Sequence, residues 1–440
     1  MSVPTLQEQQ EAAIRRAELD ALESITFEQL QAVFDKWMLL PDRFIVKFLM
    51  SCYCANELSQ RPVWAMVVAA SGGGKTELLN SMLSLEKIYS ISSLTPSTFL
   101  SGMPGPRDNS LLPKVTGKIL VFKDWTVILS MQKDARAEIF GQFRDIHDGA
   151  TTKEFGNGQK RSWKGKVSIL AACTESIDLN QQQNAHLGER FIYYRPVMPA
   201  RLEVAERALN NASHQDQMGK ELQDAVYSFI KGVDLSKFDS LPELSDEMKM
   251  ELIHLTNFST LARSSVIRDF GFKKEVIFVP APEMPTRVLQ QLSLLAGGAM
   301  IVNNGILLQN DIEMIYKTAL DSIPRTNYIV IRELAKADGQ TTAAIAAALG
   351  YPTDTIRTYL ENITMIGVCN REKSEGRGDK WSMKPEFIKI IRRYENIQQL
   401  TADQLKDRED AAKTPEQVDI DDQWEEMTAE METPPGNPMA

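Results

Sequence analysis

Eight residues, Ala69-Ala-Ser-Gly-Gly-Gly-Lys-Thr76, combine glycines with a lysine and a hydroxyl directly after the apolar residues 63–68. Glycines let backbone N–H groups surround a polyphosphate, a lysine reaches its outer phosphates, and a hydroxyl can hold Mg²⁺. We therefore expect Ser71, Gly72, Gly73, Gly74 and Lys75 to bind phosphates and Thr76 to bind the metal ion. Ala69 departs from the usual glycine at the first motif position. The alternative is a glycine-rich turn that binds nothing.

A carboxylate that could complete a magnesium site follows the next apolar run. Residues 119–122 are apolar and lead into Lys123 and Asp124, so we expect Asp124 to hold Mg²⁺ and take part in hydrolysis. Most ATP hydrolases place a second carboxylate near this point to orient the attacking water. Here the next residue is Trp125. Either Asp124 does both, or Glu77, Asp145 or Glu175 approaches in the fold.

The elements that must position these groups alternate along the chain. Strand patterns occur at residues 63–68, 119–123, 167–172 and 191–195, with helical stretches between most of them. This alternation predicts an α/β fold with a parallel sheet flanked by helices. Residues 1–40 and 201–322 are mostly helical in pattern, and residues 280–285 contain three prolines that precede a helix beginning at Thr286.

A second helical pattern begins at residue 323. Helices are expected at 328–336, 341–349 and 353–366, followed by two short strands within 368–383, which is the order of a winged helix-turn-helix. Arg357 would then face duplex DNA from the third helix, and Arg371 and Arg377 would contact its backbone. The alternative is a winged helix that binds protein.

The most basic part of the chain lies at residues 149–166. Two β-prone arms flank Gly156-Asn-Gly158, a strong hairpin turn, and they carry Lys153, Lys160, Arg161 and Lys164. Phe155 and Trp163 alternate with these cations, so the hairpin could hold single-stranded DNA through phosphate contacts with aromatic support. A solvated surface hairpin is the alternative.

The net charge of −10 belongs almost entirely to the C-terminal end. Residues 401–440 contain twelve acidic and three basic residues, a net of −9, which leaves −1 for the rest. We expect residues 396–440 to be a disordered acidic tail that could bind a replication partner. No apolar run is long enough to span a membrane, and the four cysteines are scattered, so we expect a cytoplasmic protein.

These motifs resemble those of AAA+ P-loop ATPases, particularly the minichromosome-maintenance helicase branch. Thr174, after the apolar residues 167–173, resembles the sensor 1 residue that detects the γ-phosphate. Arg190 in Gly188-Glu-Arg-Phe191 matches an arginine finger acting on a neighbouring subunit's nucleotide, and Arg287 resembles the sensor 2 arginine of the lid. The 149–166 hairpin matches the pre-sensor-1 hairpin of AAA+ helicases.

The resemblance extends over residues 41–195 to ATPases of phages and mobile elements. Further motifs carry it: Ile91-Ser-Ser-Leu-Thr95, Phe122-Lys-Asp-Trp125 and Gly141-Gln-Phe-Arg-Asp-Ile-His-Asp-Gly149. It implies an ATPase core (41–200), and the lid (201–322) and winged helix (323–395) resemble the broader class more loosely. The N-terminal extension (1–40) and the tail (396–440) are expected from their sequence patterns alone. The implied protein is a homo-oligomer, expected to be a hexamer, that uses ATP and Mg²⁺ as a DNA helicase. A helicase loader or initiator and a non-hydrolysing ATP-gated adaptor are the alternatives.

Overall fold

The chain divides into two compact units, Met1–Phe387 and Ile388–Ala440. The computed structural model describes residues 5–59, 61–103, 105, 108–179, 190–269, 275–373 and 378–396. Of the second unit, residues 388–396 are described and are helical. The expected acidic tail lies outside the described residues from position 397 onward. The division into five segments remains a prediction.

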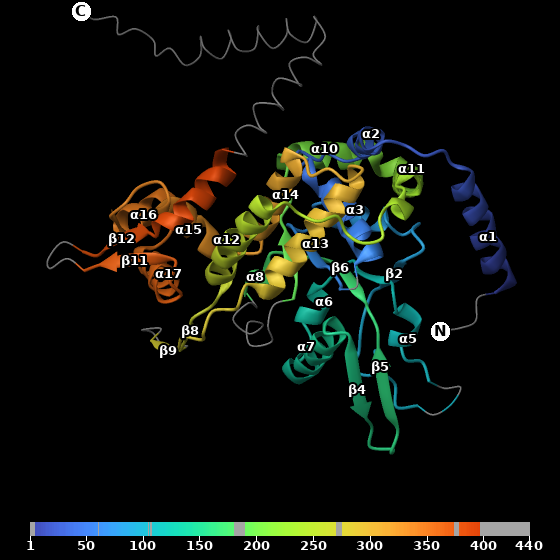
Figure 1. Ribbon diagram of the computed structural model, residues 1–440, viewed down its shortest axis with the longest axis horizontal. Coiled ribbons are helices and arrows are strands. Elements are labelled where there is room, and N and C mark those ends of the chain that lie inside the picture. Colours follow the sequence, from blue (N-terminus) through green and yellow to red (C-terminus); the bar gives the residue numbers. More distant parts are fainter. Residues whose placement is uncertain are drawn as a thin grey trace, which may run out of the picture. The chain divides into compact units, whose positions relative to one another are not determined.

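A parallel sheet of five strands forms the centre of the first unit, in the order β2-β3-β6-β1-β7 (Figure 1). The strands are β1 (Trp64–Val68), β2 (Ile88–Ile91), β3 (Ile119–Phe122), β6 (Ser168–Cys173) and β7 (Ile192–Tyr194). Four of them confirm the predicted strands. The edge strand β2 was not predicted, because it is short and its Ser90 interrupts the apolar pattern.

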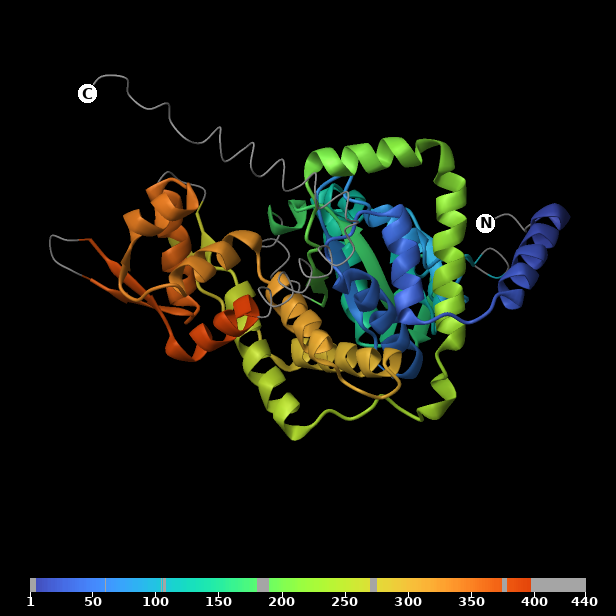
Figure 2. The ribbon, with the colours of Figure 1, turned by 90° about the horizontal axis from the view of Figure 1, so that it is seen from above.

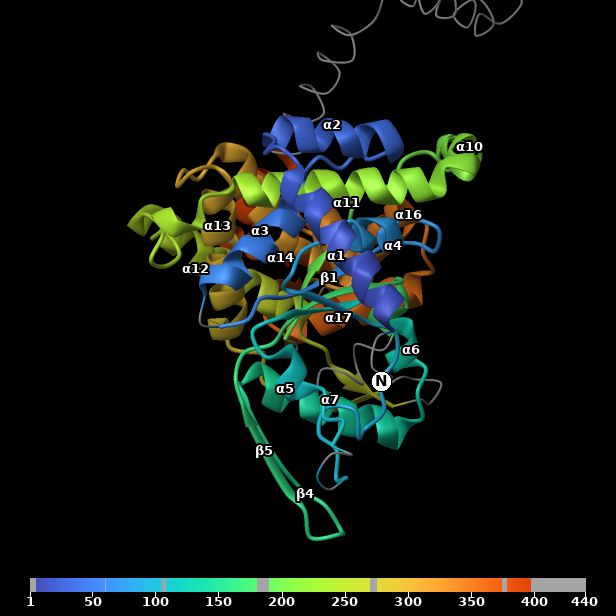
Figure 3. The same cartoon turned by 90° about the vertical axis from the view of Figure 1, so that its right-hand side faces the viewer.

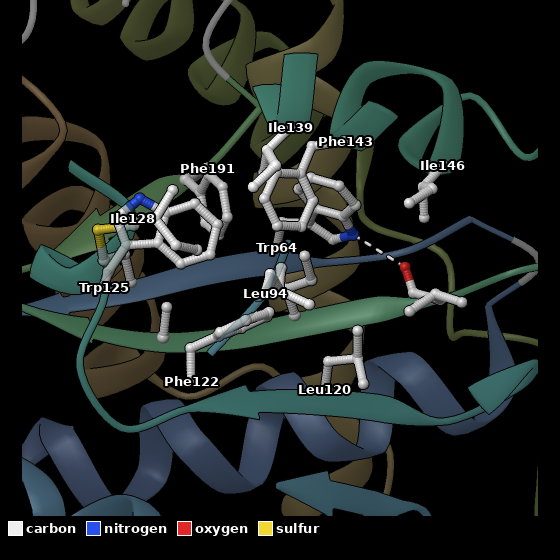
Figure 4. Packing of buried hydrophobic residues seen from close by; sticks show 14 of the residues in the cluster. Trp64, Leu94, Leu120, Phe122, Trp125, Ile128, Ile139, Phe143, Ile146 and Phe191 are labelled. Atoms are coloured by element: carbon white, nitrogen blue, oxygen red, sulfur yellow. Dashed lines mark hydrogen bonds between the residues drawn. The ribbon is translucent and has the colours of Figure 1, made fainter. Parts of the chain in front are cut away.

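The sheet is buried on both faces, as its continuous apolar strands require. Every residue of β1, β3 and β6 is buried. On one face, Trp64 of β1 packs against Phe143, with ring centroids 5.8 Å apart (Figure 4). Phe143 lies on α7 (Lys133–His147), which covers this face with α6 (Thr126–Leu129).

The helix α3 (Phe44–Leu58) lies near the β7 edge of the sheet, where its Phe48 ring is 4.6 Å from that of Tyr194. It also packs on α13 (Thr286–Val302). Their backbones approach so closely that a Cβ at Gly298 would lie 2.0 Å from the Ser51 carbonyl oxygen. Glycine is therefore required at this crossing.

Helices precede and follow the sheet, as the sequence predicts. The two N-terminal helices are α1 (Leu6–Ala21) and α2 (Phe27–Trp37), and each begins with a threonine capping box. The helices after β7 are α10 (Arg201–Asn211), α11 (Gln215–Gly232), α12 (Asp246–Arg263), α13 and α14 (Gln309–Asp321). In Figure 2, α10 and α11 are the two green helices that meet at a bend. Helix α13 begins at Thr286, as predicted.

Short helices connect the strands of the core: α4 (Lys75–Asn80), α5 (Leu112–Val115) and α8 (Ser176–Leu179). The predicted basic hairpin is confirmed as β4 (Ala150–Glu154) and β5 (Lys160–Lys164), and it extends away from the sheet (Figures 1 and 3). A second two-stranded sheet, β8 (Ile267–Arg268) with β9 (Val276–Phe278), was not predicted.

The three predicted C-terminal helices are present as α15 (Arg325–Leu334), α16 (Thr342–Leu349) and α17 (Thr353–Met365). The predicted strand pair is β11 (Cys369–Glu372) with β12 (Lys380–Met383), and β10 (Gln340–Thr341) adds a third antiparallel strand. None of the helices in the described ranges is long and apolar enough to cross a membrane. All four cysteines are buried and unpaired.

Candidate functional site

The predicted phosphate-binding residues lie where three neighbouring strands end. The chain order switches beside β1, which lies between β6 and β7, and ligands of open α/β sheets bind at such a point outside the carboxyl ends of the strands. The Ala69 N–H donates to Cys173 O at 3.2 Å, and the Trp125 N–H donates to Ala172 O at 2.7 Å. Backbone hydrogen bonds therefore hold the chain side by side at the ends of β1, β6 and β3.

The glycine-rich loop adopts backbone conformations that need glycine. Gly72 and Gly74 have φ of 77° and 70°, in the left-handed region. A Cβ at Gly73 would lie 2.7 Å from Cε of Met198 and 3.1 Å from Ala70 O. Ala69 does not have a positive φ, so the alanine fits where the usual motif has glycine. The departure from the motif leaves the loop geometry intact.

The Lys75 ammonium group lies inside the loop. It donates to the carbonyl oxygens of Ala69 and Ala70 at 2.8 and 2.6 Å. Burial lowers the pKa of Lys75, while the nearby carboxylates of Asp124, Glu175 and Glu77 oppose this shift. A cation held by carbonyls in a partly desolvated loop can exchange those partners for phosphate oxygens.

A pocket of about 430 Å³ opens over this loop. Its lining brings together all the predicted residues of the loop from Ser71 to Thr76 with Asp124 and Thr174. The structure thus brings these residues, which were singled out from the sequence, to one cavity. Thr174 Oγ1 lies 2.7 Å from Ser176 Oγ.

The other half of the pocket was missed by sequence reasoning. It is formed by residues 37–40 at the C-terminal end of α2, by Met198 and Pro199, by one face of α10, and by Gln215 and Met218 of α11. Arg207 and Asn211 of α10 donate to the carbonyl oxygens of Lys36 and Trp37, at 2.9 and 2.7 Å. No motif links these segments, which lie more than 150 residues apart in the sequence.

Asp124 faces the pocket, whereas Trp125 does not. Asp124 Oδ1 accepts from the Thr126 N–H at 2.9 Å and also from the Thr126 hydroxyl. Trp125 is 2% exposed and packs in the core. Of the three other carboxylates considered, Glu77 lines the pocket and Glu175 follows Thr174. Asp145 is not among the lining residues and accepts instead from the Thr151 hydroxyl at 3.2 Å.

Arg190 and Arg287 are not among the residues that line this pocket. Arg190 precedes β7, at the amino edge of the sheet, and its guanidinium lies 3.2 Å from Asp148. Burial lowers the pKa of Arg190; Asp148 opposes this shift and the charge of Arg287 adds to it. Arg287 Nε is 4.0 Å from Glu283, and its Nη1 is buried without a hydrogen-bond partner among the described residues. The two arginines are thus neighbours.

The basic hairpin has two chemically different faces. Lys160 and Lys164 are exposed, and Lys160 pairs with Glu154 at 2.7 Å. Lys153 instead donates to Glu138 at 2.9 Å, and Arg161 donates to Met103 O at 2.9 Å. Successive residues of a strand point to opposite faces, which explains the division.

The two aromatic residues of the hairpin contact residues outside the hairpin. Trp163 is buried and donates to the Thr116 hydroxyl at 2.9 Å. Phe155 lies over Gly102, where a Cβ would be 2.6 Å from its ring. Core packing covers the ring of Trp163, which is therefore not exposed beside the basic residues of the hairpin.

The C-terminal arginines have different surroundings. Arg357 is exposed on α17. Arg371 donates to Asp379 at 3.0 Å, lies 3.6 Å from Glu361, and stacks over Trp381. Its guanidinium is thus already committed to two carboxylates. Arg377 lies outside the described residues, as do Gly188 and Glu189 of the motif before Phe191.

Within the described residues, no group of three or more His, Cys, Asp or Glu side chains is arranged to hold a metal ion. Thr76 and Asp124 could supply a hydroxyl and a carboxylate to Mg²⁺, which usually keeps several waters and takes other ligands from phosphates. A comparison with protein-family models finds none that matches this chain, and a comparison with curated proteins finds no match.

Proposed function

We propose that this protein is an AAA+ ATPase of phage or mobile-element type that binds ATP and Mg²⁺ and works on DNA as a ring-forming helicase or translocase. One observation carries the proposal: the ends of β1, β3 and β6 bring Lys75, Asp124 and Thr174 to one pocket over a glycine loop. A glycine loop, a lysine, a hydroxyl and a strand-end carboxylate are the parts that P-loop enzymes use for phosphoryl transfer.

Each residue has a distinct role in this proposal. The loop N–H groups from Ser71 to Gly74 and the Lys75 ammonium bind the phosphates, and Thr174 contacts the γ-phosphate. Thr76 and Asp124 hold Mg²⁺, which neutralises charge on the phosphates when bound. Met38 and Met198, whose methyl groups lie over the glycine loop, add apolar lining that packs against the nucleotide.

The arginines act between subunits. Arg190 lies at the amino edge of the sheet and Lys75 at the carboxyl edge, so the proposed finger reaches the γ-phosphate of a neighbouring copy. Its planar, permanently charged guanidinium suits a transferring phosphoryl group. Arg287, which we expected to contact the nucleotide from the lid, lies beside Arg190 and would support it in this proposal.

DNA binds at two places in this proposal. The exposed face of the β4–β5 hairpin offers Lys160 and Lys164 to single-stranded backbone inside the ring. The C-terminal helices and strands form a winged helix that holds duplex DNA, with Arg357 on its third helix.

A second candidate function is favoured by Trp125. Because this buried side chain replaces a water-orienting carboxylate, an ATP-gated adaptor that binds but does not hydrolyse ATP is the rival. A helicase loader is a further alternative, which would hydrolyse ATP as the helicase does but would unwind little DNA.

The decisive experiment compares phosphate release by the parent chain, a Lys75→Ala variant and a Lys249→Ala surface control. We expect hydrolysis to fall by orders of magnitude only in Lys75→Ala, because the loop loses its fixed cation. Equal turnover in all three would overturn the ATPase. ATP binding without phosphate release by the parent would favour the adaptor, and hydrolysis without strand displacement on a forked substrate would favour the loader.

A further inference from the structure

Two methionine side chains lie over the glycine loop, and they come from segments far apart in the sequence. A Cβ at Gly74 would lie 2.8 Å from Cε of Met38, and a Cβ at Gly73 would lie 2.7 Å from Cε of Met198. Both methionines line the pocket. The shape of the pocket above the loop therefore depends on how the segments that carry these two side chains are held.

A buried carboxylate, that of Asp42, joins the two segments. Asp42 lies four residues after Met38, and it accepts the N–H of Val197, the residue before Met198, at 2.9 Å. It also accepts the Tyr194 hydroxyl at 2.6 Å. Asp42 is 4% exposed, and hydrogen bonds to a charged group that is shielded from water are strong. The carboxylate therefore fixes one segment relative to the other.

Lys317 of α14 supplies the countercharge for Asp42. Its ammonium lies 3.7 Å from Asp42 and 2.8 Å from Asp321, and it donates to the carbonyl oxygen of Arg195. Burial opposes the charge of Lys317, but the carboxylates of Asp321 and Asp42 outweigh burial and raise the pKa of Lys317. Lys317 is thus a permanent cation behind the carboxylate that joins the two segments.

A second buried pair of lysine and aspartate allows a comparison. Lys47 of α3 lies 2.5 Å from Asp311 of α14, and both side chains are buried. Asp311 also accepts the Leu308 N–H at 2.8 Å. Neither Lys47 nor Asp311 is among the residues that line the pocket. This pair matches Asp42 and Lys317 in chemistry and burial but not in location.

We propose that Asp42 is a positioning residue of the pocket, which holds Met38 and Met198 over the glycine loop where they contact a bound nucleotide. This role rests on the proposed function for the identity of that ligand. Methionine side chains are flexible, so their contacts with a ligand depend on the backbone that carries them being fixed. Loss of the Asp42 carboxylate should therefore weaken nucleotide binding, although Asp42 itself is not among the lining residues.

Nucleotide binding by full-length variants tests this role. Asp42→Asn keeps the size of the side chain but replaces an acceptor oxygen with a donor, and Asp311→Asn makes the same change in the comparison pair. We expect the Kd of a ribose-labelled fluorescent ATP analogue to rise about tenfold in Asp42→Asn and to stay at the parent value in Asp311→Asn. Thermal unfolding shows that both variants are folded. Equal Kd values in the two folded variants would overturn the role of Asp42.

A more conservative pair of variants decides the question if Asp42→Asn does not fold. Tyr194→Phe removes one donor to Asp42 and keeps the aromatic ring. Tyr316→Phe is its control, because the Tyr316 hydroxyl donates to a different carboxylate, that of Glu251, at 2.5 Å. We expect the Kd to rise about threefold in Tyr194→Phe and to stay at the parent value in Tyr316→Phe. A parent value in both would count against Asp42.

Methyl spectra of the methionines report on the positions of the side chains without any ligand. In chains labelled with carbon-13 at the methionine methyl groups, Asp42→Asn should shift the signals of Met38 and Met198, whereas Asp311→Asn should leave them in place. Unchanged signals of both methionines in Asp42→Asn would overturn the role of Asp42 even if the Kd rises. A parent chain that binds no ATP analogue would reject the proposed function, and the methyl spectra would then decide by themselves whether Asp42 positions the two methionines.

Discussion

The indole of Trp125 lies 5.1 Å from the ring of Phe143, inside the core on the α7 face of the sheet. It is also 5.1 Å from Phe122 and from Phe191. The residue that follows Asp124 is thus an anchor of the fold. A carboxylate at this position would be buried among aromatic rings, so in the proposed ATPase a group that orients water would come from another segment.

Glu77 and Glu175 are the two alternatives for that role in the proposed ATPase, and we test Glu175 first. Glu77 lines the pocket, and Glu175 follows Thr174 and raises the pKa of Lys75. Glu175→Gln should lower kcat by about 10²–10⁴-fold while ATP binding is retained, since a general base contributes about this factor. Arg325 lies 3.3 Å from Glu175, so Arg325→Gln is the control for loss of the ion pair. Unchanged turnover in Glu175→Gln, with loss in Glu77→Gln, would assign the role to Glu77.

Arg190 should act on a neighbour's nucleotide. Arg190→Ala should bind ATP normally and hydrolyse it about 10³–10⁵-fold more slowly, as other arginine fingers indicate. Mixing it with Lys75→Ala should restore activity, because some junctions then pair an intact pocket with an intact arginine. Arg16→Ala, which removes a surface arginine of α1, is the control. No recovery at any mixing ratio would contradict action in trans.

The sequence predicted the residues of the pocket that lie at strand ends, because their signals are local. A glycine loop, a strand-end Asp124 and a strand-end Thr174 each carry their own signal, and parallel strands bring their ends together. The other half of the pocket was not predicted. It joins residues 37–40 to Met198 and α10 through tertiary packing, and Arg207 there binds a backbone carbonyl that no sequence pattern marks.

For the basic hairpin, too, local residues predicted the element but not its tertiary contacts. Its turn and strands were predicted from local residues, but the period of two that sends Lys160 outward also sends Trp163 into the core. Which face is inward depends on Thr116 and Gly102, which lie outside the hairpin. Charge alone therefore overestimated the number of basic side chains of the hairpin that are exposed.

Substitutions of the basic residues of the hairpin should have two different effects. Changing Lys160 and Lys164 to Ala should reduce the salt dependence of single-stranded DNA binding by about 0.7 per lost phosphate contact, without loss of stability. Arg161→Ala should instead lower the thermal unfolding midpoint, because it breaks the contacts with Met103 O and Asp108. Salt titrations of fluorescence anisotropy and thermal melts measure the two effects. An unchanged salt slope in the double variant would make the hairpin purely structural.

His147 should make stability depend on pH. Burial lowers its pKa to about 4, with the charge of Arg190 adding to the shift and Asp148 opposing it. The unfolded chain takes up this proton below about pH 6.5 and the folded chain only below about 4, so the contribution is complete above 6.5 and is lost between 6.5 and 4.

The expected loss in the free energy of unfolding between pH 7 and pH 4 that is due to His147 is about 3 kcal/mol. Urea unfolding at pH 7 and pH 4 of the parent and of His147→Gln measures it, since the carboxylates titrate alike in both. Equal losses in the two chains would contradict the low pKa of His147.

Two glycines in helices should respond oppositely to alanine. In α13, a Cβ at Gly298 would lie 2.0 Å from the Ser51 carbonyl oxygen, so Gly298→Ala must separate α13 from α3. Overpacking of this kind costs about 1–3 kcal/mol or more. In α11, no atom lies within 4 Å of a Cβ at Gly219, so Gly219→Ala should stabilise the protein by about 0.5–1 kcal/mol through helix propensity. Urea unfolding of the two variants measures both changes in the free energy of unfolding, a loss for Gly298→Ala and a gain for Gly219→Ala. If Gly298→Ala were neutral, the α3–α13 crossing could not be as close as the backbone positions require.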